Sequence, residues 1–307
     1  MSTPPETSDS ARSFLLFLGG LCVLVVAGVV LGSVFFGPPT LKQYDRSTPD
    51  ALLEAARDMV VNGDAERLHE LLYTDSDEME ALYARLGWVL GHLQDLAVAI
   101  NDRFPEEVAA AREKAEAEAR AGRGMSLFEQ FGMGARRARR GSSSAGEGSR
   151  FNALVQTIAT DPYAWLTAAE GRLRYVEIDD ERVAVLWDDK PVFPPFGLVM
   201  RQDQGQWSVV LPLHNIPWLS SYMPQTPEEY SIWGSLLQMV DNVLVDLEAD
   251  VGEGRLHSLD ALARATGEKA VVPMGMGMIA YDRALKDRRK REREAREAAK
   301  AGKDGGG

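Results

Sequence analysis

Cysteine is almost absent from this chain, since Cys22 is the only one among 307 residues. Residues 37–307 therefore hold no structural disulfide and no cysteine-ligated metal. The same stretch lacks the GxxxxGK(S/T), GxGxxG, HExxH and CxxC spacings. Their absence excludes the common phosphate-cradling loops, the helical zinc-protease site and the dithiol redox site.

Histidine is also scarce, with four in the chain. No two of them stand three or four residues apart, so no helix can present a histidine pair to a metal. We therefore expect neither a metal site nor a cofactor. The four are His69, His92, His214 and His257.

Charge is missing from residues 13–36, which are almost entirely apolar. At about 1.5 Å per residue, a helix of this length measures about 36 Å and crosses a hydrocarbon core of about 30 Å with some tilt. A secretory signal has a shorter apolar region, of roughly 7–15 residues, behind a basic start. Here Arg12 is the only base ahead of the segment, and Leu21 is too large to precede a lipoprotein cysteine at Cys22. The sequence predicts an uncleaved transmembrane helix at 13–36, behind a tail at 1–12.

Two opposed arguments bear on the side of the membrane. Arg12 precedes the span, whereas Lys42, Arg46 and Arg57 follow it, and this difference favours a cytoplasmic domain. Long domains behind one N-terminal anchor are, however, most often exported in bacteria. We expect the bacterial inner or plasma membrane, with the domain on its extracytoplasmic side.

Beyond the span, the composition is that of a globular protein. The chain is 45% hydrophobic and 26% charged, as in ordinary folded domains. We expect a tether at 37–47, one domain at 48–281 and a charged helical or disordered tail at 282–307. The tail has ten basic and six acidic residues, so the net charge of −12 is concentrated in the domain. An acidic domain disfavours nonspecific binding to nucleic acid.

The first part of the domain has the pattern of amphipathic helices. Thr48 followed by Pro49 predicts a helix start, and Asn62-Gly63 predicts its end. A short helix from Asp64 and a long one from about 76 to 103 follow, with apolar residues at three- and four-residue steps.

Residues 122–150 break this pattern. They are rich in glycine, serine and arginine, a composition that cannot bury enough apolar surface to fold. We predict a disordered basic insertion within the domain. Its candidates for contact with an anionic surface are Arg136, Arg137, Arg139 and Arg140.

After the insertion, the apolar period changes from helical to two. This alternation marks strands at 172–178, 183–187, 198–201 and 207–213. A capping box of Thr226 and Glu229 then opens a helix to about 251, and further helices are predicted at 258–265 and 279–301. The predicted fold class is α+β, with amphipathic helices packed on a four-stranded antiparallel meander and with C-terminal helices.

Two features of the domain carry a resemblance to a known family. The first is a capped helix start at 48–53 with a helix break at 62–65, and the second is the hairpin at 198–210. With the order of helices before a strand meander, they resemble the NTF2-like (SnoaL-like, cystatin-like α+β) superfamily over 48–104 and 171–213. The resemblance implies N-terminal helices in the concave face of a curved sheet. It also implies a cone-shaped pocket, where enzymes of the superfamily use Asp, His and Tyr. No position here can be matched to those residues.

Candidate site residues come from two patterns. His92 and Asp95 stand one helical turn apart and could act as an acid–base pair, although an exposed helix pair has the same spacing. Aromatic residues in and after the strands could line an apolar pocket, although the core of a sheet uses the same residues. These aromatic residues are Trp187, Trp207, Trp218 and Tyr222.

Three functions are compatible with the sequence. The first, which we favour, is a single-pass membrane protein whose non-catalytic domain binds a protein or a small apolar ligand near the bilayer. The second is an NTF2-like enzyme of the hydratase or isomerase type. The third is an adaptor that binds anionic lipid or nucleic acid through the basic insertion or tail. In each case, Gly28 and Gly32 form a GxxxG that could pair two spans in a homodimer.

Overall fold

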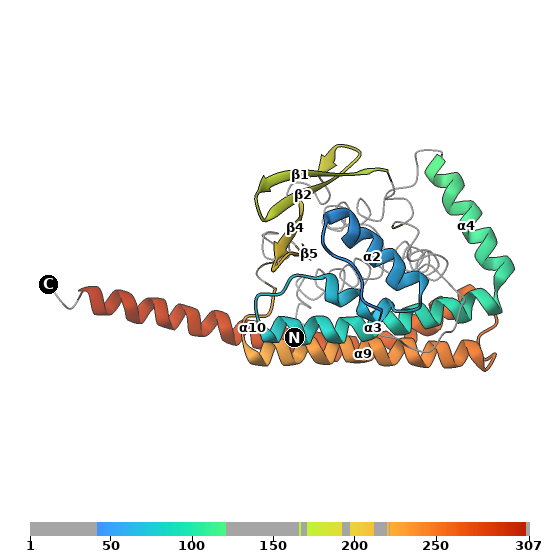
Figure 1. Ribbon diagram of the computed structural model, residues 1–307. Coiled ribbons are helices and arrows are strands. Elements are labelled where there is room, and N and C mark those ends of the chain that lie inside the picture. Colours follow the sequence, from blue (N-terminus) through green and yellow to red (C-terminus); the bar gives the residue numbers. More distant parts are fainter. Residues whose placement is uncertain are drawn as a thin grey trace, which may run out of the picture.

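The computed structural model describes residues 42–120, 166, 171–191, 197–211, 220 and 222–304. Among these residues, no helix is both long enough and apolar enough to cross a membrane. The transmembrane helix predicted at 13–36, with Gly28 and Gly32, and the insertion at 122–150 lie outside the described residues. The described part is α+β, with an antiparallel sheet on long helices (Figure 1).

Helix α2 (Pro49–Val61) begins where the sequence predicts. Thr48 is its N-cap, because the hydroxyl oxygen accepts a hydrogen bond of 3.0 Å from the backbone N–H of Ala51. Gly63, with a φ of 81°, turns the chain after the helix. The 3₁₀ helix η1 (Ala65–Leu71) follows and packs on the next helix.

Three long helices form the base of the domain and lie side by side in Figure 1. They are α3 (Asp77–Arg103), α9 (Pro227–Gly252) and α10 (Leu259–Asp304). Helices α3 and α9 run parallel: Arg85 reaches the carbonyl of Gly234, and one heptad further His92 meets Asp241, an offset of 149 residues in both contacts. The constant offset keeps one face of each helix on the other.

Helix α10 returns antiparallel to α9. Near its start, Lys269 lies 3.0 Å from the carboxylate of Asp250, close to the end of α9. Further along, the ring of Tyr281 packs edge-on against Trp233, close to the start of α9, with 5.8 Å between ring centroids. Helix α4 (Pro105–Arg120) continues from the end of α3 and extends away from this layer (Figure 1).

Helix α10 is continuous where the sequence predicts separate helices at 258–265 and 279–301, and Pro273 lies inside it. Apolar side chains of this segment are buried in the main core: Met274, Met278, Tyr281 and Leu285. Gly277 allows α10 to approach α9 closely, since a Cβ there would lie 2.4 Å from Cδ2 of Leu236. Tertiary burial therefore outweighs the tendency of proline and glycine to end a helix.

The sheet has five antiparallel strands, not the four that the sequence predicts. They are β1 (Leu173–Asp179), β2 (Arg182–Trp187), β3 (Lys190–Pro191), β4 (Leu198–Asp203) and β5 (Gln206–Val210). The order is β1-β2-β4-β5, and β3 pairs with the end of β2 beside β4. Strand β3 has two residues, one of them proline, so it shows no alternation that sequence analysis could detect.

Apolar side chains fill the space between the sheet and the helices. The sheet contributes Val183, Val185, Met200 and Trp207, and the helices contribute among others Leu52, Met59, Leu86 and Leu236. A second, smaller cluster lies where α3, α4, α9 and α10 meet, and includes Ile100, Phe104, Val108, Leu247 and Leu262.

Residues 42–47, which the sequence assigns to the tether, pack on the domain. Tyr44 is buried, and its hydroxyl donates a hydrogen bond to the carboxylate of Asp64. The backbone N–H of Trp207 donates to the carbonyl of Arg46 at 2.7 Å, which covers the outer edge of β5. Residues 42–47 therefore belong to the folded domain, although the sequence assigns them to the tether.

Candidate functional site

A polar cluster at the α3–α9 interface contains two of the predicted residues. Nδ1 of His92 lies 2.6 Å from Oδ1 of Asp241, so His92 has its partner on α9 and not on its own helix. The side chain of Asp241 is 8% exposed, whereas that of His92 is 38% exposed. Gln238 donates to the other oxygen of Asp241 at 3.2 Å. The buried carboxylate thus fixes the orientation of a half-exposed imidazole.

Asp95 lies at the edge of the same cluster, near Glu248 of α9. Partial burial raises the pKa of Asp95, and the neighbouring His92 opposes this shift. Partial burial also raises the pKa of Glu248, with a further contribution from the charge of Asp95 and opposition from His92. Two carboxyl groups, one from each helix, therefore share this edge of the interface.

The chemistry open to this cluster depends on access to a substrate. A carboxylate-oriented imidazole is the arrangement that general bases use, but proton transfer to a substrate requires a cavity that brings the substrate within hydrogen-bond distance. Among the described residues, no group of three or more His, Cys, Asp or Glu side chains is arranged to hold a metal ion.

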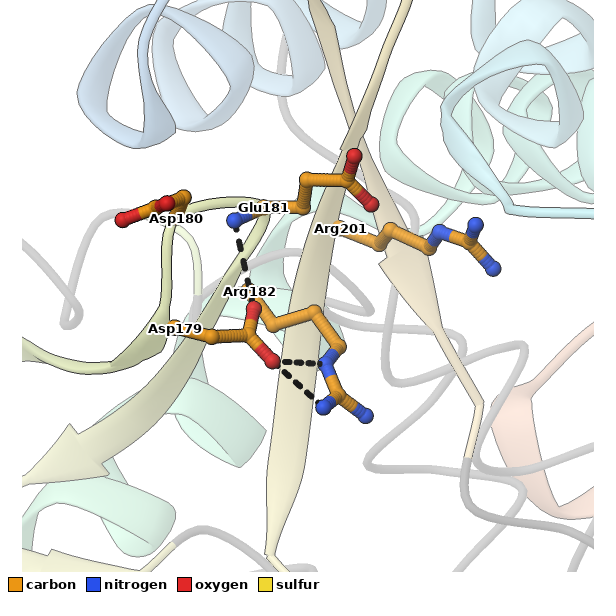
Figure 2. Close-up of a pocket in the computed structure, with 5 residues that line it drawn as sticks. All are labelled: Asp179, Asp180, Glu181, Arg182 and Arg201. Carbon is orange, nitrogen blue, oxygen red and sulfur yellow. Dashed lines mark hydrogen bonds and ion pairs between the residues drawn. The ribbon is translucent and has the colours of Figure 1, made fainter.

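A depression of about 430 Å³ lies elsewhere, at the β1–β2 turn (Figure 2). It is lined by Asp179, Asp180, Glu181, Arg182 and Arg201. Arg182 donates to Asp179 at 2.8 Å, and Figure 2 shows Arg201 pointing away from this pair. Arg201 instead donates to the hydroxyl of Tyr73 at 2.8 Å and lies over its ring. Both arginines of the depression are therefore engaged within the protein, and no predicted site residue lines it.

The described aromatic candidates do not surround one cavity. Trp207 is buried in the core, and Trp187 is half-buried with the guanidinium of Arg172 at 4.8 Å from its ring centroid. The carbonyl of Tyr222 accepts a hydrogen bond of 2.5 Å from the hydroxyl of Tyr281. The remaining candidates lie outside the described residues: Trp218, Arg136, Arg137, Arg139 and Arg140.

A buried ion pair joins the start of α9 to α10, and sequence reasoning missed it. Nη1 of Arg288 donates to Oε2 of Glu229 at 2.5 Å, and the two side chains are 9% and 0% exposed. The same guanidinium nitrogen donates to the carbonyl of Met223 at 3.2 Å. The available signal was helical spacing, because Arg288 continues the buried face of Tyr281 and Leu285.

Asp241 could also have been found from the sequence. It interrupts the apolar face of α9 one turn after Leu237 and one turn before Leu244. A carboxylate in such a position requires a partner from another element. The pattern does not identify that partner as His92, which is 149 residues away.

Comparison with protein-family models, with curated proteins and with solved structures finds no match to this chain. The resemblance to the NTF2-like superfamily stays a prediction.

Proposed function

We propose that this protein is a single-pass membrane protein whose α+β domain is a non-catalytic binding module, and that it binds a protein partner along α10. The observation that carries the proposal is the part of α10 that extends beyond the body of the domain. The predicted span at 13–36 and the packing of residues 42–47 support its position close to the bilayer.

The last turns of α10 form an arm, which we define as residues 289–304. Arg288 is the last buried residue before it, and every side chain from 289 to 298 is exposed. Figure 1 shows this end of the helix leaving the body. Ion pairs one turn apart support the arm, such as Lys290 with Glu294 at 3.9 Å. The exposed part of the arm contributes no side chain to the core of the domain. We therefore infer that it presents a surface to a partner.

Among the described residues the core is filled, and this supports a binding module over an enzyme with a cone-shaped pocket. Leu52 and Met59 from α2 meet Val185 and Trp207 from the sheet, where such a pocket would lie. The same filling favours a protein partner over a small apolar ligand, since that ligand needs a preformed cavity.

The short connection to the span supports function near the membrane. Five residues, 37–41, separate the predicted span from the first described residue of the domain. Even fully extended, they reach about 18 Å. The domain would therefore stay within about one to two helix diameters of the lipid headgroups.

Photo-cross-linking in cells of the native host tests the binding function. A photoreactive amino acid replaces Arg293 or Arg296 of the full-length chain, and controls carry it at the exposed Glu54 or Val61 of α2. We expect discrete protein adducts from the arm positions only. Adducts of equal intensity from both sets, or none from the arm, would overturn the proposal.

The anchor is tested separately by alkaline extraction of membranes. We expect the intact chain to stay in the membrane fraction and a Leu24→Arg, Val26→Arg variant to be released, because each arginine costs about 2.5–3.5 kcal/mol at the centre of a span. Thr40→Arg, outside the span, is the matched control and should not change the distribution. Full release of the intact chain would contradict a transmembrane anchor.

A second candidate function is that of an adaptor whose arm binds anionic lipid, and the composition of the arm favours it. The arm has seven basic and four acidic residues. If it binds lipid, removal of residues 289–307 should reduce the binding of the full chain to vesicles with anionic headgroups, and added salt should have the same effect.

A further inference from the structure

The outer side of α10 carries an apolar stripe with nothing packed on it among the described residues. Its members are Val271, Val272, Met276 and Ile279, which are 67%, 65%, 68% and 57% exposed. The spacing of 272, 276 and 279 places three of them in one line along the helix. Single exposed apolar residues are common, but a continuous apolar stripe on a folded domain indicates a contact surface.

Opposite charges stand at the two ends of the stripe. Glu268 lies one turn before Val272, and Arg283 lies one turn after Ile279, all on the exposed side of α10. In the described part of the chain, the ion pairs that α10 makes use other side chains, such as Lys269, Lys286 and Arg288. Within that part, the stripe is therefore flanked by one unpaired anion and one unpaired cation.

We propose that the stripe binds the same stripe of a second copy of this chain, with the two α10 helices antiparallel about a two-fold axis near Gly275 and Met276. Antiparallel pairing about this point places Val272 of each copy opposite Ile279 of the other. It also places Glu268 of each copy opposite Arg283 of the other, so two ion pairs close the interface. Such self-complementary surfaces are what a two-fold dimer requires.

The backbone near the proposed axis permits close approach. A Cβ added to Gly275 would meet no atom within 4 Å, so this turn of α10 is open to the outside. A small residue at the centre of a helix pair lets the two backbones lie close together.

The same pairing gives the arm an acidic surface to contact. Running antiparallel, the arm of one copy passes the start of α10 in the other copy and reaches the end where α3, α4 and α9 meet. Exposed acids outnumber exposed bases there: Asp102, Glu106, Glu107, Glu253 and Asp260 stand against Arg103, Arg255 and Arg264, and Arg255 is paired with Glu253. The arm is net basic, so the charges are complementary. The inference thus rests on the proposed function of α10 and names its partner.

A second copy fits this surface better than a lipid bilayer does. An anionic membrane attracts the arm and Arg283 but repels Glu268 and the acidic body. A second copy places an opposite charge against both Glu268 and Arg283. Two anchored chains would also share one membrane, which raises their effective concentration and compensates for a modest interface.

Charge exchange in the full-length chain, purified in detergent, tests the pairing. The dimer dissociation constant is measured by sedimentation equilibrium. We expect Glu268→Lys and Arg283→Glu each to weaken the dimer about threefold to tenfold, since each places like charges together at two points. The double exchange should restore the affinity to within about twofold. A double variant that stays as weak as the single ones would overturn the pairing.

Cross-linking at the axis provides a second test. Met276→Cys, which leaves Gly275 in place beside the axis, is made in a Cys22→Ser background, so that the chain has one thiol, and a short bis-maleimide is added to the detergent-solubilised chain. We expect a covalent dimer, and none from the exposed control Val61→Cys. Equal cross-linking at both positions would point to random collision and contradict the proposal.

Further variants distinguish this interface from a contact within the predicted span and from a contact with a different protein. Met276→Lys should weaken the dimer about tenfold or more, because two cations then meet at the axis. If Met276→Lys leaves the dimer dissociation constant unchanged but Gly28→Leu with Gly32→Leu abolishes the dimer, the contact lies in the predicted span and this inference is refuted. Arm adducts that consist solely of another protein would refute the second copy while leaving the proposed binding function intact.

Discussion

Helix α9 has two helix interfaces, and each contains a buried carboxylate with a different kind of partner. Towards α10, Glu229 is fully buried and pairs with Arg288, which is itself 9% exposed. Towards α3, Asp241 is 8% exposed and pairs with His92, which is 38% exposed. The first contact is closed on all sides, whereas the second reaches solvent through the imidazole.

The difference separates a fully desolvated contact from a partly solvated one. The guanidinium of Arg288 and the carboxylate of Glu229 are both removed from water, so loss of either group leaves the other buried without its partner. The imidazole of His92 keeps access to water, so loss of the α3–α9 contact should cost less. The α10 surface proposed for binding therefore rests on the more deeply buried contact.

The largest effect is expected from Arg288→Met. Removal of the guanidinium leaves the carboxylate of Glu229 buried without its cation, which costs roughly 3–5 kcal/mol of the free energy of unfolding. Urea denaturation of the detergent-solubilised chain measures the loss. Arg291→Met, on the exposed arm, is the matched control and should change stability by less than about 0.5 kcal/mol. Equal effects of the two variants would show that the buried pair is not a special contact.

A smaller loss, of about 1–3 kcal/mol, is expected from His92→Ala. The variant leaves the nearly buried Asp241 with Gln238 as its hydrogen-bond donor. The same denaturation experiment on Asp241→Ala and on the double variant gives the coupling energy of the pair, which should lie near 0.5–3 kcal/mol. Additive single losses would mean that the observed contact contributes nothing.

The close approach of α9 and α10 is tested by two glycines of one helix. Gly277→Ala should reduce stability by about 1–2 kcal/mol, because its Cβ would lie 2.4 Å from Leu236. Gly275→Ala would meet no atom of its own chain, so in the monomer, at concentrations well below the dimer dissociation constant, it should raise stability by about 0.5–1 kcal/mol through helix propensity. Thermal unfolding of both variants measures the difference, and a common sign would contradict this packing.

The smallest effect concerns pH. Burial raises the pKa of Asp95 in the folded chain. The folded state therefore binds this proton more tightly than the unfolded state, and the penalty for the charged carboxylate is present above the raised pKa. We expect Asp95→Asn to stabilise the chain by a few tenths of a kcal/mol at pH 7, after allowance for solvent screening. The gain should shrink as the pH falls through the range just above about 4.

Asp250 is the control of opposite sign for this experiment. The hydrogen bond from Lys269 lowers the pKa of Asp250, so its contribution is present at neutral pH and lost as the pH falls. Asp250→Asn should therefore destabilise the chain at pH 7, and its effect should fade in acid. Denaturation curves between pH 4 and 7 that show the same sign for Asp95→Asn and Asp250→Asn would contradict the assignment of both shifts.

Local signals in the sequence determined where most elements begin and what type they are. Thr48 and Thr226 cap α2 and α9, and the period of two marked four of the five strands. These signals act over a few residues through backbone hydrogen bonds and side-chain alternation, so they can be predicted without knowing the fold. The apolar segment at 13–36 is a signal of the same local kind.

Only the tertiary structure decided which of these elements meet. The pairing of His92 with Asp241 depends on the parallel packing of two helices 149 residues apart in the chain. The continuity of α10 through Pro273 depends on the burial of its apolar face against α9. Burial energies belong to surfaces that come together in the fold, and local spacing carries no information about which surface lies opposite.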